Sequence, residues 1–342
     1  MSTKPTPLNA QQMRLLAVLA LINFVNFAAR QAVVPLIPLL RDHLHATDAQ
    51  LGDLQTWLLV VLAIASIPFG FLADRFSRKS IIATGIICWS VASFAGGLFS
   101  TFLYFLSARA LVGLGEAAYA PAAQSMISGA FPQERRAFAQ AIFAAGMLLG
   151  GASGLALGGI VGPRYGWQAV LFVVAILGIF PGLALLGIEE PPRGPRSEVV
   201  PIPRLLSVPA FVSLIAAGIC ITFSSVSLIS WGVDFAVNYK DFSLREASVS
   251  LALVTLFALV LGVLAGGYVA DRLQRSFVYG RIIAVAAAFL LAAPFLLLAI
   301  QSEEKSTVLA SRATSIALCP HVGRHGGRRD KADPDRHNVE GP

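Results

Sequence analysis

Charged side chains are scarce in this chain, and their absence is concentrated in long stretches. Only 13% of the 342 residues are Asp, Glu, Lys or Arg, whereas typical soluble domains have about 25%. The mean hydropathy is +0.71. This composition excludes an ordinary soluble globular protein, so we expect lipid to be the solvent for most of the chain.

Seven stretches contain no charged residue, and each is close to the roughly 20 residues that span a bilayer as a helix. They are Leu54–Ala73, Ile81–Leu98, Ala137–Val161, Trp167–Ile188, Leu205–Val233, Ala247–Ala270 and Ile282–Gln301. Two further runs, Leu15–Leu40 and Thr101–Phe131, are as long but contain internal charge. The sequence therefore predicts an all-α integral membrane protein with about nine transmembrane helices.

Cysteine is also rare, with three in the chain. Cys88 and Cys220 lie in apolar runs and Cys319 lies in a polar tail, so neither a disulfide framework nor a metal-binding spacing is present. No Ser/His/Asp, Cys/His or metal-ligand constellation occurs at a workable spacing. The sequence therefore indicates that the protein is not an enzyme and needs no cofactor or metal.

The formal charge of +7 raises the question of nucleic-acid binding, but the positions of the basic residues indicate membrane topology instead. With the N-terminus in the cytoplasm, the basic residues on the inside are Lys4, Arg14, Arg75, Arg78, Lys79, Arg135, Arg136, Arg193, Arg196, Arg204, Arg272, Arg275 and Arg281. Those on the outside are only Arg41, Arg164, Lys240, Arg245 and Lys305. This bias predicts a multi-pass inner-membrane protein with a cytoplasmic N-terminus and no nucleic-acid partner. The first apolar run is too long for a signal-peptide core, so we expect a retained helix.

A nine-residue pattern occurs twice in the chain. GFLADRFSR at Gly70–Arg78 returns as GYVADRLQR at Gly267–Arg275, each time after a long apolar run, which indicates a duplicated protein. A carboxylate at such a helix end can cap a facing helix or pair with arginine in one conformation and release it in another. We therefore predict a conformational latch formed by Gly70, Asp74, Arg75, Arg78, Gly267, Asp271, Arg272 and Arg275. The alternative is a short hairpin whose charges only set topology.

The stretch Glu189–Arg204, EEPPRGPRSEVVPIPR, divides the chain, because its prolines and charges can neither continue a helix nor enter lipid. We predict an N-terminal six-helix half over residues 1–188, a cytoplasmic linker over 189–204 and three helices of a C-terminal half over 205–301. The repeat calls for six helices in the second half. The polar tail over 302–342 is therefore predicted to be out of frame, so that the chain is truncated or frameshifted after helix nine; the alternative is a genuine disordered tail.

Three formally charged side chains lie deep inside the predicted helices: Arg30, Arg109 and Glu116. Such a group near mid-membrane costs about 2.5–3.5 kcal/mol, so it normally faces a partner or a water-filled path. Arg109 and Glu116 are close to two helical turns apart and therefore share a face. We interpret the group as anion-binding arginines with a titratable carboxylate. The alternative is that Glu116 only neutralises an arginine.

Glycines recur at intervals of four in the fifth predicted helix. Gly150, Gly154 and Gly158 fall on one side, where they would let a neighbouring helix approach closely. The sequence therefore predicts helix packing through these glycines, and a hinge or sliding surface is the alternative.

Several of these segments resemble a known transporter family. Gly70–Lys79 resembles the signature between helices two and three of the major facilitator superfamily, and Gly267–Arg275 resembles its second-half copy. The fourth predicted helix, RALVGLGEAAYAPA at Arg109–Ala122, is similar to that of spinster-like members. Further similar segments are Asn26–Arg30, Phe131–Arg136, Gly166–Trp167 and Trp231. The resemblance covers residues from about 15 to 301.

This resemblance implies two six-helix domains around a central cavity, which rock relative to each other during transport. The family would couple transport to protons through an Asp in helix one and the Glu carried here as Glu116. This chain has Ala29 where the family commonly has that Asp. Either Glu116 alone carries the proton, or transport is uncoupled.

We therefore predict a secondary active transporter that moves a small organic solute, amphipathic or anionic, across the lipid bilayer by alternating access, with protons as the candidate coupling ion. The predicted substrate and coupling residues are Asn26, Arg30, Arg109, Glu116 and Trp231. A second hypothesis is a non-transporting remnant or membrane partner that keeps its helices for assembly only.

Overall fold

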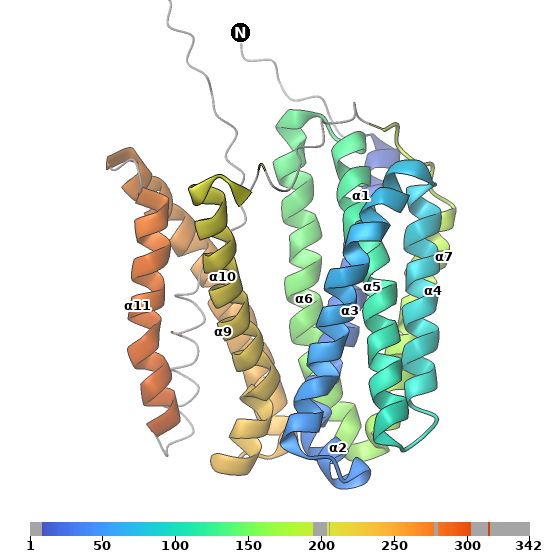
Figure 1. Ribbon diagram of the computed structural model, residues 1–342, viewed down its shortest axis with the longest axis vertical. Helices are drawn as coiled ribbons and strands as arrows, with labels where there is room; N and C mark the ends of the chain where they lie inside the picture. The colour runs from blue at the N-terminus through green and yellow to red at the C-terminus, as the bar shows by residue number, and fades with distance from the viewer. Residues whose placement is uncertain (1–8, 194–203, 205, 277–279, 302–313, 315–342) are drawn as a thin grey trace, which may run out of the picture.

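The computed structural model describes residues 9–193, 204, 206–276, 280–301 and 314, and they are almost entirely helical (Figure 1). The helices are α1 (Ala10–Ala32), the 3-10 helix η1 (Val34–Leu36), α2 (Ile37–Leu44), α3 (Asp48–Arg75), α4 (Arg78–Gly96), α5 (Phe102–Ala130), α6 (Gln133–Tyr165), α7 (Trp167–Leu186), α9 (Pro209–Tyr239), α10 (Leu244–Ser276) and α11 (Gly280–Gln301). The all-α architecture predicted from the sequence is confirmed. Most of the predicted tail over 302–342, and the linker from 194 to 203, lie outside the described residues.

Six helical stretches of the described residues are long and apolar enough to cross a membrane. They are Ala10–Leu44, Asp48–Arg75, Arg78–Gly96, Gln133–Tyr165, Trp167–Leu186 and Phe211–Tyr239. Many of their large apolar side chains, such as Ile64 and Phe180, are exposed on the outside of the bundle, as lipid-facing positions should be.

The first predicted helix, over Leu15–Leu40, is not a single helix. α1 ends at Ala32, η1 follows, and α2 then continues to Leu44. Pro35 and Pro38 occupy the first turns of η1 and α2, where a missing backbone N–H is tolerated. Neither proline could continue α1, because the ring clashes with the carbonyl four residues earlier. The prolines therefore break this segment, which places Arg41 on a separate short helix.

Two buried apolar clusters fill the N-terminal bundle formed by α1 to α7. Along α1 the first cluster ends at Val25 and the second begins at Ala29. The second cluster includes Phe105 and Trp167, whose rings meet edge to face with centroids 5.4 Å apart. Arg30 therefore follows directly after the first residue of α1 that belongs to the second cluster.

Glycines on α6 allow its backbone to lie directly against that of α1. A Cβ atom built on any of the three predicted packing glycines would collide with a backbone carbonyl oxygen of α1; the pairs are Gly150 with Phe24, Gly154 with Ala28 and Gly158 with Ala32. Contact this close favours van der Waals and Cα–H···O interactions between helices. It fixes the position of α1, which carries Arg30.

The C-terminal helices α9 and α10 contact the N-terminal bundle mainly at one end of the molecule, which we call the α2 end, and α11 packs against α10 (Figure 1). There Val233 and Ala236 of α9 are buried, together with Leu251 of α10. At the opposite end, which we call the linker end, α9 is uncovered by the described residues. From Val212 to Ser224 its side chains are exposed apart from half-buried Ile221.

The glycine contact between α6 and α1 makes a testable prediction. Gly150→Ala should lower the thermal unfolding midpoint of the detergent-solubilised protein, because its methyl group meets the Phe24 carbonyl and overpacking costs about 1–3 kcal/mol. Gly151→Ala is the matched control, since its Cβ would lie 3.8 Å from Gln31 Cγ, an ordinary contact. Equal midpoints for the two variants would contradict the packing described.

Candidate functional site

An ion pair between α1 and α5 forms the core of the candidate site. Arg30 Nε donates to Glu116 Oε2 at 3.0 Å, and Arg30 Nη2 donates to the same oxygen. The Arg30 side chain is 17% exposed and that of Glu116 only 1%. An isolated charge at such a place would be strongly unfavourable, so the contact between Arg30 and Glu116 offsets the cost of burying both groups. The structure thus joins two of the three intramembrane charges.

Arg109 lies about two turns from Glu116 on α5 and is 4% exposed. It interacts electrostatically with both Glu116 and Arg30. Its Nη2 lies 3.5 Å from Gln55 Oε1 on α3, a long hydrogen bond. Gln55 is not among the site residues predicted from the sequence, because it carries no formal charge. A polar amide inside the run Leu54–Ala73 was the signal that could have found it.

Three buried polar atoms here have no hydrogen-bond partner in the part of the chain that the structure describes: Asn26 Nδ2, Arg109 Nε and Glu116 Oε1. By contrast, Asn23 Nδ2 on the same helix as Asn26 donates to the Phe143 carbonyl oxygen at 2.7 Å. Buried polar groups in proteins are nearly always hydrogen-bonded. Asn26 Nδ2 and Arg109 Nε can therefore donate a hydrogen bond to water or a solute, and Glu116 Oε1 can accept one.

Two neighbours of Arg30 shape its surroundings. The Arg30 Cζ atom lies 5.0 Å from the centroid of the Phe27 ring, a favourable cation–π distance. Ala29 is buried and carries no titratable group. Trp231 on α9 packs elsewhere, against the apolar cluster at the α2 end, where its Cζ2 lies 3.6 Å from the position a Cβ on Gly52 would take.

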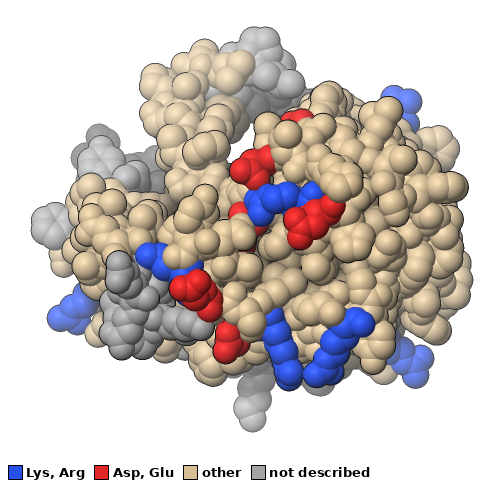
Figure 2. Space-filling model, turned by 90° about the horizontal axis from the view of Figure 1, so that it is seen from below, with Lys and Arg blue, Asp and Glu red and all other residues tan. Residues whose placement is uncertain are grey.

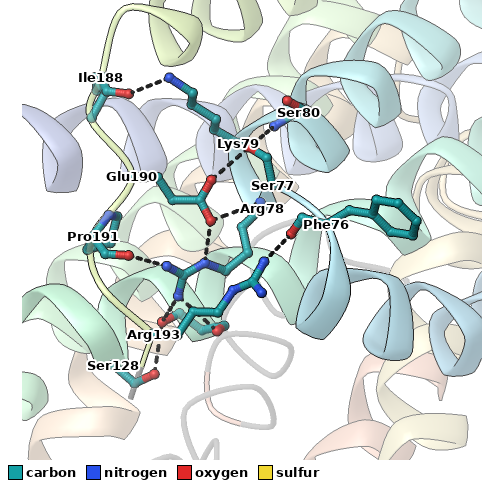
Figure 3. Close-up of polar contacts among 11 residues, drawn as sticks. Phe76, Ser77, Arg78, Lys79, Ser80, Ser128, Ile188, Glu190, Pro191 and Arg193 are labelled. Atoms are coloured by element: carbon teal, nitrogen blue, oxygen red, sulfur yellow. Dashed lines mark hydrogen bonds and ion pairs between the residues drawn. The ribbon is translucent and has the colours of Figure 1, made fainter. Parts of the chain in front are cut away.

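Arg78, the last residue of the first repeat, is enclosed at the linker end (Figure 3). Its side chain is 1% exposed, and its Nε donates to Glu190 Oε1 at 2.8 Å. Its Nη1 donates to the Ser125 carbonyl oxygen at 3.1 Å, and its Nη2 donates to the Pro191 carbonyl oxygen. Ser77 Oγ donates to the second oxygen of Glu190 at 2.7 Å. Arg78 therefore binds the start of the linker to α4 and α5.

Further contacts extend this linker clamp, which we define as Ser77, Arg78 and Glu190. Arg193 Nη2 donates to the Phe76 carbonyl oxygen at 2.6 Å (Figure 3). Burial raises the pKa of the Glu190 carboxyl, but hydrogen bonds from Arg78 and Ser77 outweigh that effect and hold the pKa below its usual value. Glu190 therefore stays ionised at neutral pH and keeps the clamp closed.

The other predicted latch residues of the first repeat have different surroundings. Asp74 and Arg75 are exposed at the end of α3, and a Cβ built on Gly70 would meet no atom of the described residues within 4 Å. Asp74 and Gly70 border an open cavity of about 380 Å³ between α3 and α5. In the second repeat Arg272 is exposed. The surroundings of Gly267, Asp271 and Arg275 in that repeat lie outside what the structure describes. The latch role of both repeats stays a prediction.

The linker clamp makes a second testable prediction. Glu190→Gln should speed tryptic cleavage after Arg193 at neutral pH, because the loss of charge-assisted hydrogen bonds costs about 1.5–3 kcal/mol and leaves Arg78 buried without its carboxylate. Glu189→Gln is the matched control, since Glu189 is exposed and accepts only from Gln11 among the described contacts.

The lowered pKa of Glu190 also predicts how the stability of the clamp depends on pH. A depressed folded-state pKa contributes stability above the unfolded value of about 4.3, and that contribution is lost as pH falls through the folded pKa. The difference in thermal midpoint between wild type and Glu190→Gln should therefore persist from pH 7 to about 4.3 and shrink below it. A difference that grows toward acid pH would contradict the clamp.

Comparison with known proteins places this arrangement in a family. The Major Facilitator Superfamily model matches residues 19–318. Protein spinster of Drosophila melanogaster is 28% identical over 301 residues, which cover 82% of this chain and 49% of that protein. Protein spinster homolog 1 of Homo sapiens is 28% identical over 322 residues, which cover 86% of this chain and 61% of that protein. The sphingosine-1-phosphate transporter SPNS2 of Xenopus tropicalis is 31% identical over 172 residues, which cover 49% of this chain and 34% of that protein. The chain thus spans about half to three-fifths of the length of the first two relatives.

Solved structures show the same fold. A bacterial homolog of the human lysosomal transporter spinster, in an inward-facing and occupied conformation, superposes with a TM-score of 0.80 at 24% identity, covering 92% of this chain and 73% of that one. Its inward-facing and unoccupied form gives a TM-score of 0.78. With the family match over most of its length, the chain belongs to the Major Facilitator Superfamily of membrane transporters, as a spinster-like member.

Proposed function

We propose that this protein acts in secondary active transport of a small organic solute with an anionic group, by alternating access. The observation that carries the proposal is the buried Arg30–Glu116 pair, together with Asn26 Nδ2 and Arg109 Nε, which have no hydrogen-bond partner among the described residues. Arg30 and Arg109 supply positive charge for the anion, and the Asn26 amide supplies a further donor. Charged side chains inside a membrane are energetically unfavourable, so their presence here favours a path for a solute.

Proton coupling follows from the shared Glu116 oxygen. While Glu116 is ionised it neutralises Arg30, and the pair attracts an anion weakly. A proton on Glu116 removes the negative charge, so the Arg30 guanidinium becomes free to bind the anionic group of a solute. Glu116 Oε1, which has no hydrogen-bond partner among the described residues, is the atom at which the proton enters. Ala29 cannot titrate, so in this proposal Glu116 takes the proton.

The solute class is an amphipath with an anionic head group. One relative is named a sphingosine-1-phosphate transporter, and such a lipid combines a phosphate with a long apolar chain. The phosphate matches Arg30 and Arg109, because guanidinium groups bind phosphate oxygens in bidentate geometry. The apolar stretch of α9 from Val212 to Ser224, which the described residues leave exposed, offers a surface against which such a chain could pack.

Orientation completes the proposal. We infer that the linker end faces the cytoplasm of a cell with an inner membrane, and the basic residues at this end support the inference. Contact between α9, α10 and the N-terminal bundle at the α2 end then corresponds to a conformation closed to the outside. Transport requires this contact to open while the linker end closes.

Replacing Arg109 tests the binding part of the proposal. Arg109→Ala should weaken binding of sphingosine 1-phosphate to the purified protein about ten- to a hundredfold, the loss expected for a charge-assisted hydrogen bond. Exposed Arg14→Ala is the control for general loss of positive charge. Scintillation proximity binding measures both, and unchanged affinity in Arg109→Ala would remove Arg109 from the site.

Replacing Glu116 tests the coupling. Glu116→Gln keeps an acceptor for Arg30 but cannot titrate, so uptake into liposomes should lose its dependence on an imposed pH gradient and fall to passive equilibration. Exposed Glu134→Gln should behave as wild type. Gradient-driven accumulation by Glu116→Gln would contradict the proposal. Stable wild-type protein with no flux would instead favour the non-transporting hypothesis.

A further inference from the structure

The α2 end holds a shared ion pair that is separate from the candidate site. Figure 2 views this end and shows charged side chains of both signs gathered near the middle of the face. Arg41 donates to Asp48 Oδ1 from Nε at 3.1 Å and from Nη2 at 2.7 Å. It also donates to both oxygens of Asp234, from Nη1 at 3.0 Å and from Nη2 at 3.2 Å. One guanidinium group therefore serves two carboxylates.

The two carboxylates belong to different parts of the molecule. Asp48 is the first residue of α3 in the N-terminal bundle, and its side chain is 74% exposed. Asp234 lies on α9, and its side chain is only 8% exposed. Asn238 Nδ2 supports it with a hydrogen bond to Oδ1 at 3.0 Å. The Arg41–Asp48 pair therefore stays within one part, whereas the Arg41–Asp234 pair joins the two.

The crossing pair lies beside the apolar contact that closes the α2 end. Val233, next to Asp234, is buried in a cluster with Val34 of η1 and Leu155 of α6. A Cβ on Gly159 of α6 would collide with the side chain of Ser248 on α10, so these helices also touch. If α9 and α10 move away from the N-terminal bundle, the cluster and the Arg41–Asp234 pair must separate together.

We propose that Arg41 exchanges partners during this movement: Asp234 locks the α2 end closed, and Asp48 retains Arg41 when the end opens. Removing one member of a buried pair is strongly unfavourable, whereas an exposed pair contributes little by itself. Because Asp48 already contacts Arg41, the guanidinium group keeps a charged partner throughout, and only Asp234 must become hydrated. The inference rests on the proposed alternating access.

The exchange requires the two carboxylates to act in opposite directions. Asp234→Asn removes the lock, which exists only in the closed state, so it shifts the population toward the open state. Asp48→Asn weakens the open state more than the closed one, because Asp48 is the partner that remains after opening. It therefore shifts the population toward the closed state. A purely structural salt-bridge cluster would shift in the same direction in both variants.

Cysteine accessibility measures this population directly. Ala236→Cys places a thiol in the buried cluster, in a background where Cys88, Cys220 and Cys319 are replaced by alanine. In lipid nanodiscs without solute, its reaction with a charged maleimide should be about tenfold faster with Asp234→Asn, corresponding to about 1.4 kcal/mol in the closed–open equilibrium. With Asp48→Asn it should be severalfold slower. Asp42→Asn, an exposed neighbour on α2, is the matched control and should leave the rate unchanged.

Faster labelling in Asp48→Asn would overturn the exchange, and an unchanged rate in Asp234→Asn would overturn the lock. If Asp234→Asn does not fold, Asn238→Ala replaces it, since loss of the Asn238 hydrogen bond should raise the rate in the same direction but less. The labelling needs no solute. The Arg109 and Glu116 predictions could therefore fail while the two Asp variants still shift the labelling rate in opposite directions. That combination would count against the proposed function and support the exchange.

Discussion

The interaction on which the site depends is the buried ion pair between Arg30 and Glu116, because neither charge would be tolerable in lipid without the other. The pair requires α5 to lie deep among its neighbours, and glycines permit this. A Cβ on Gly113 would collide with the Leu58 backbone of α3, and one on Gly115 would lie 2.6 Å from the Gly85 carbonyl oxygen of α4. The glycines that allow α5 to pack closely against α3 and α4 therefore also allow Glu116 to be buried next to Arg30.

The two ends of the bundle differ in what holds them together. At the linker end, Arg78 and Glu190 join the linker to its own N-terminal bundle, so this clamp leaves α9 unconstrained. At the α2 end, Arg41 and Asp234 join the N-terminal bundle to α9. A rocking movement of the two parts would therefore break the second contact and preserve the first. This asymmetry is what the proposed alternating access requires.

The architecture and the three intramembrane charges could be predicted from the sequence, since long uncharged runs and rare charges are local signals. The pairing of Arg30 with Glu116 could not be predicted. Arg30 and Arg109 lie at similar depths, and the sequence does not determine the rotation of α1 that decides which residue of α5 Arg30 faces. Pro35 and Pro38 are a local signal for the break before α2, whereas the length of the apolar run alone predicts one helix over Leu15–Leu40. The contact of Glu190 with Arg78 could not be predicted either, since it depends on how a proline-rich segment turns back onto the bundle.

The central claim is that protonation of Glu116 frees Arg30 to bind an anion, and proton uptake on binding tests it most directly. Sphingosine 1-phosphate would be added to the purified protein in weakly buffered solution near neutral pH while the proton uptake is measured with an indicator dye. The claim predicts uptake of about one proton per bound solute in the wild type and none in Glu116→Gln with binding retained. Equal uptake in the two proteins, or none in the wild type, would contradict it.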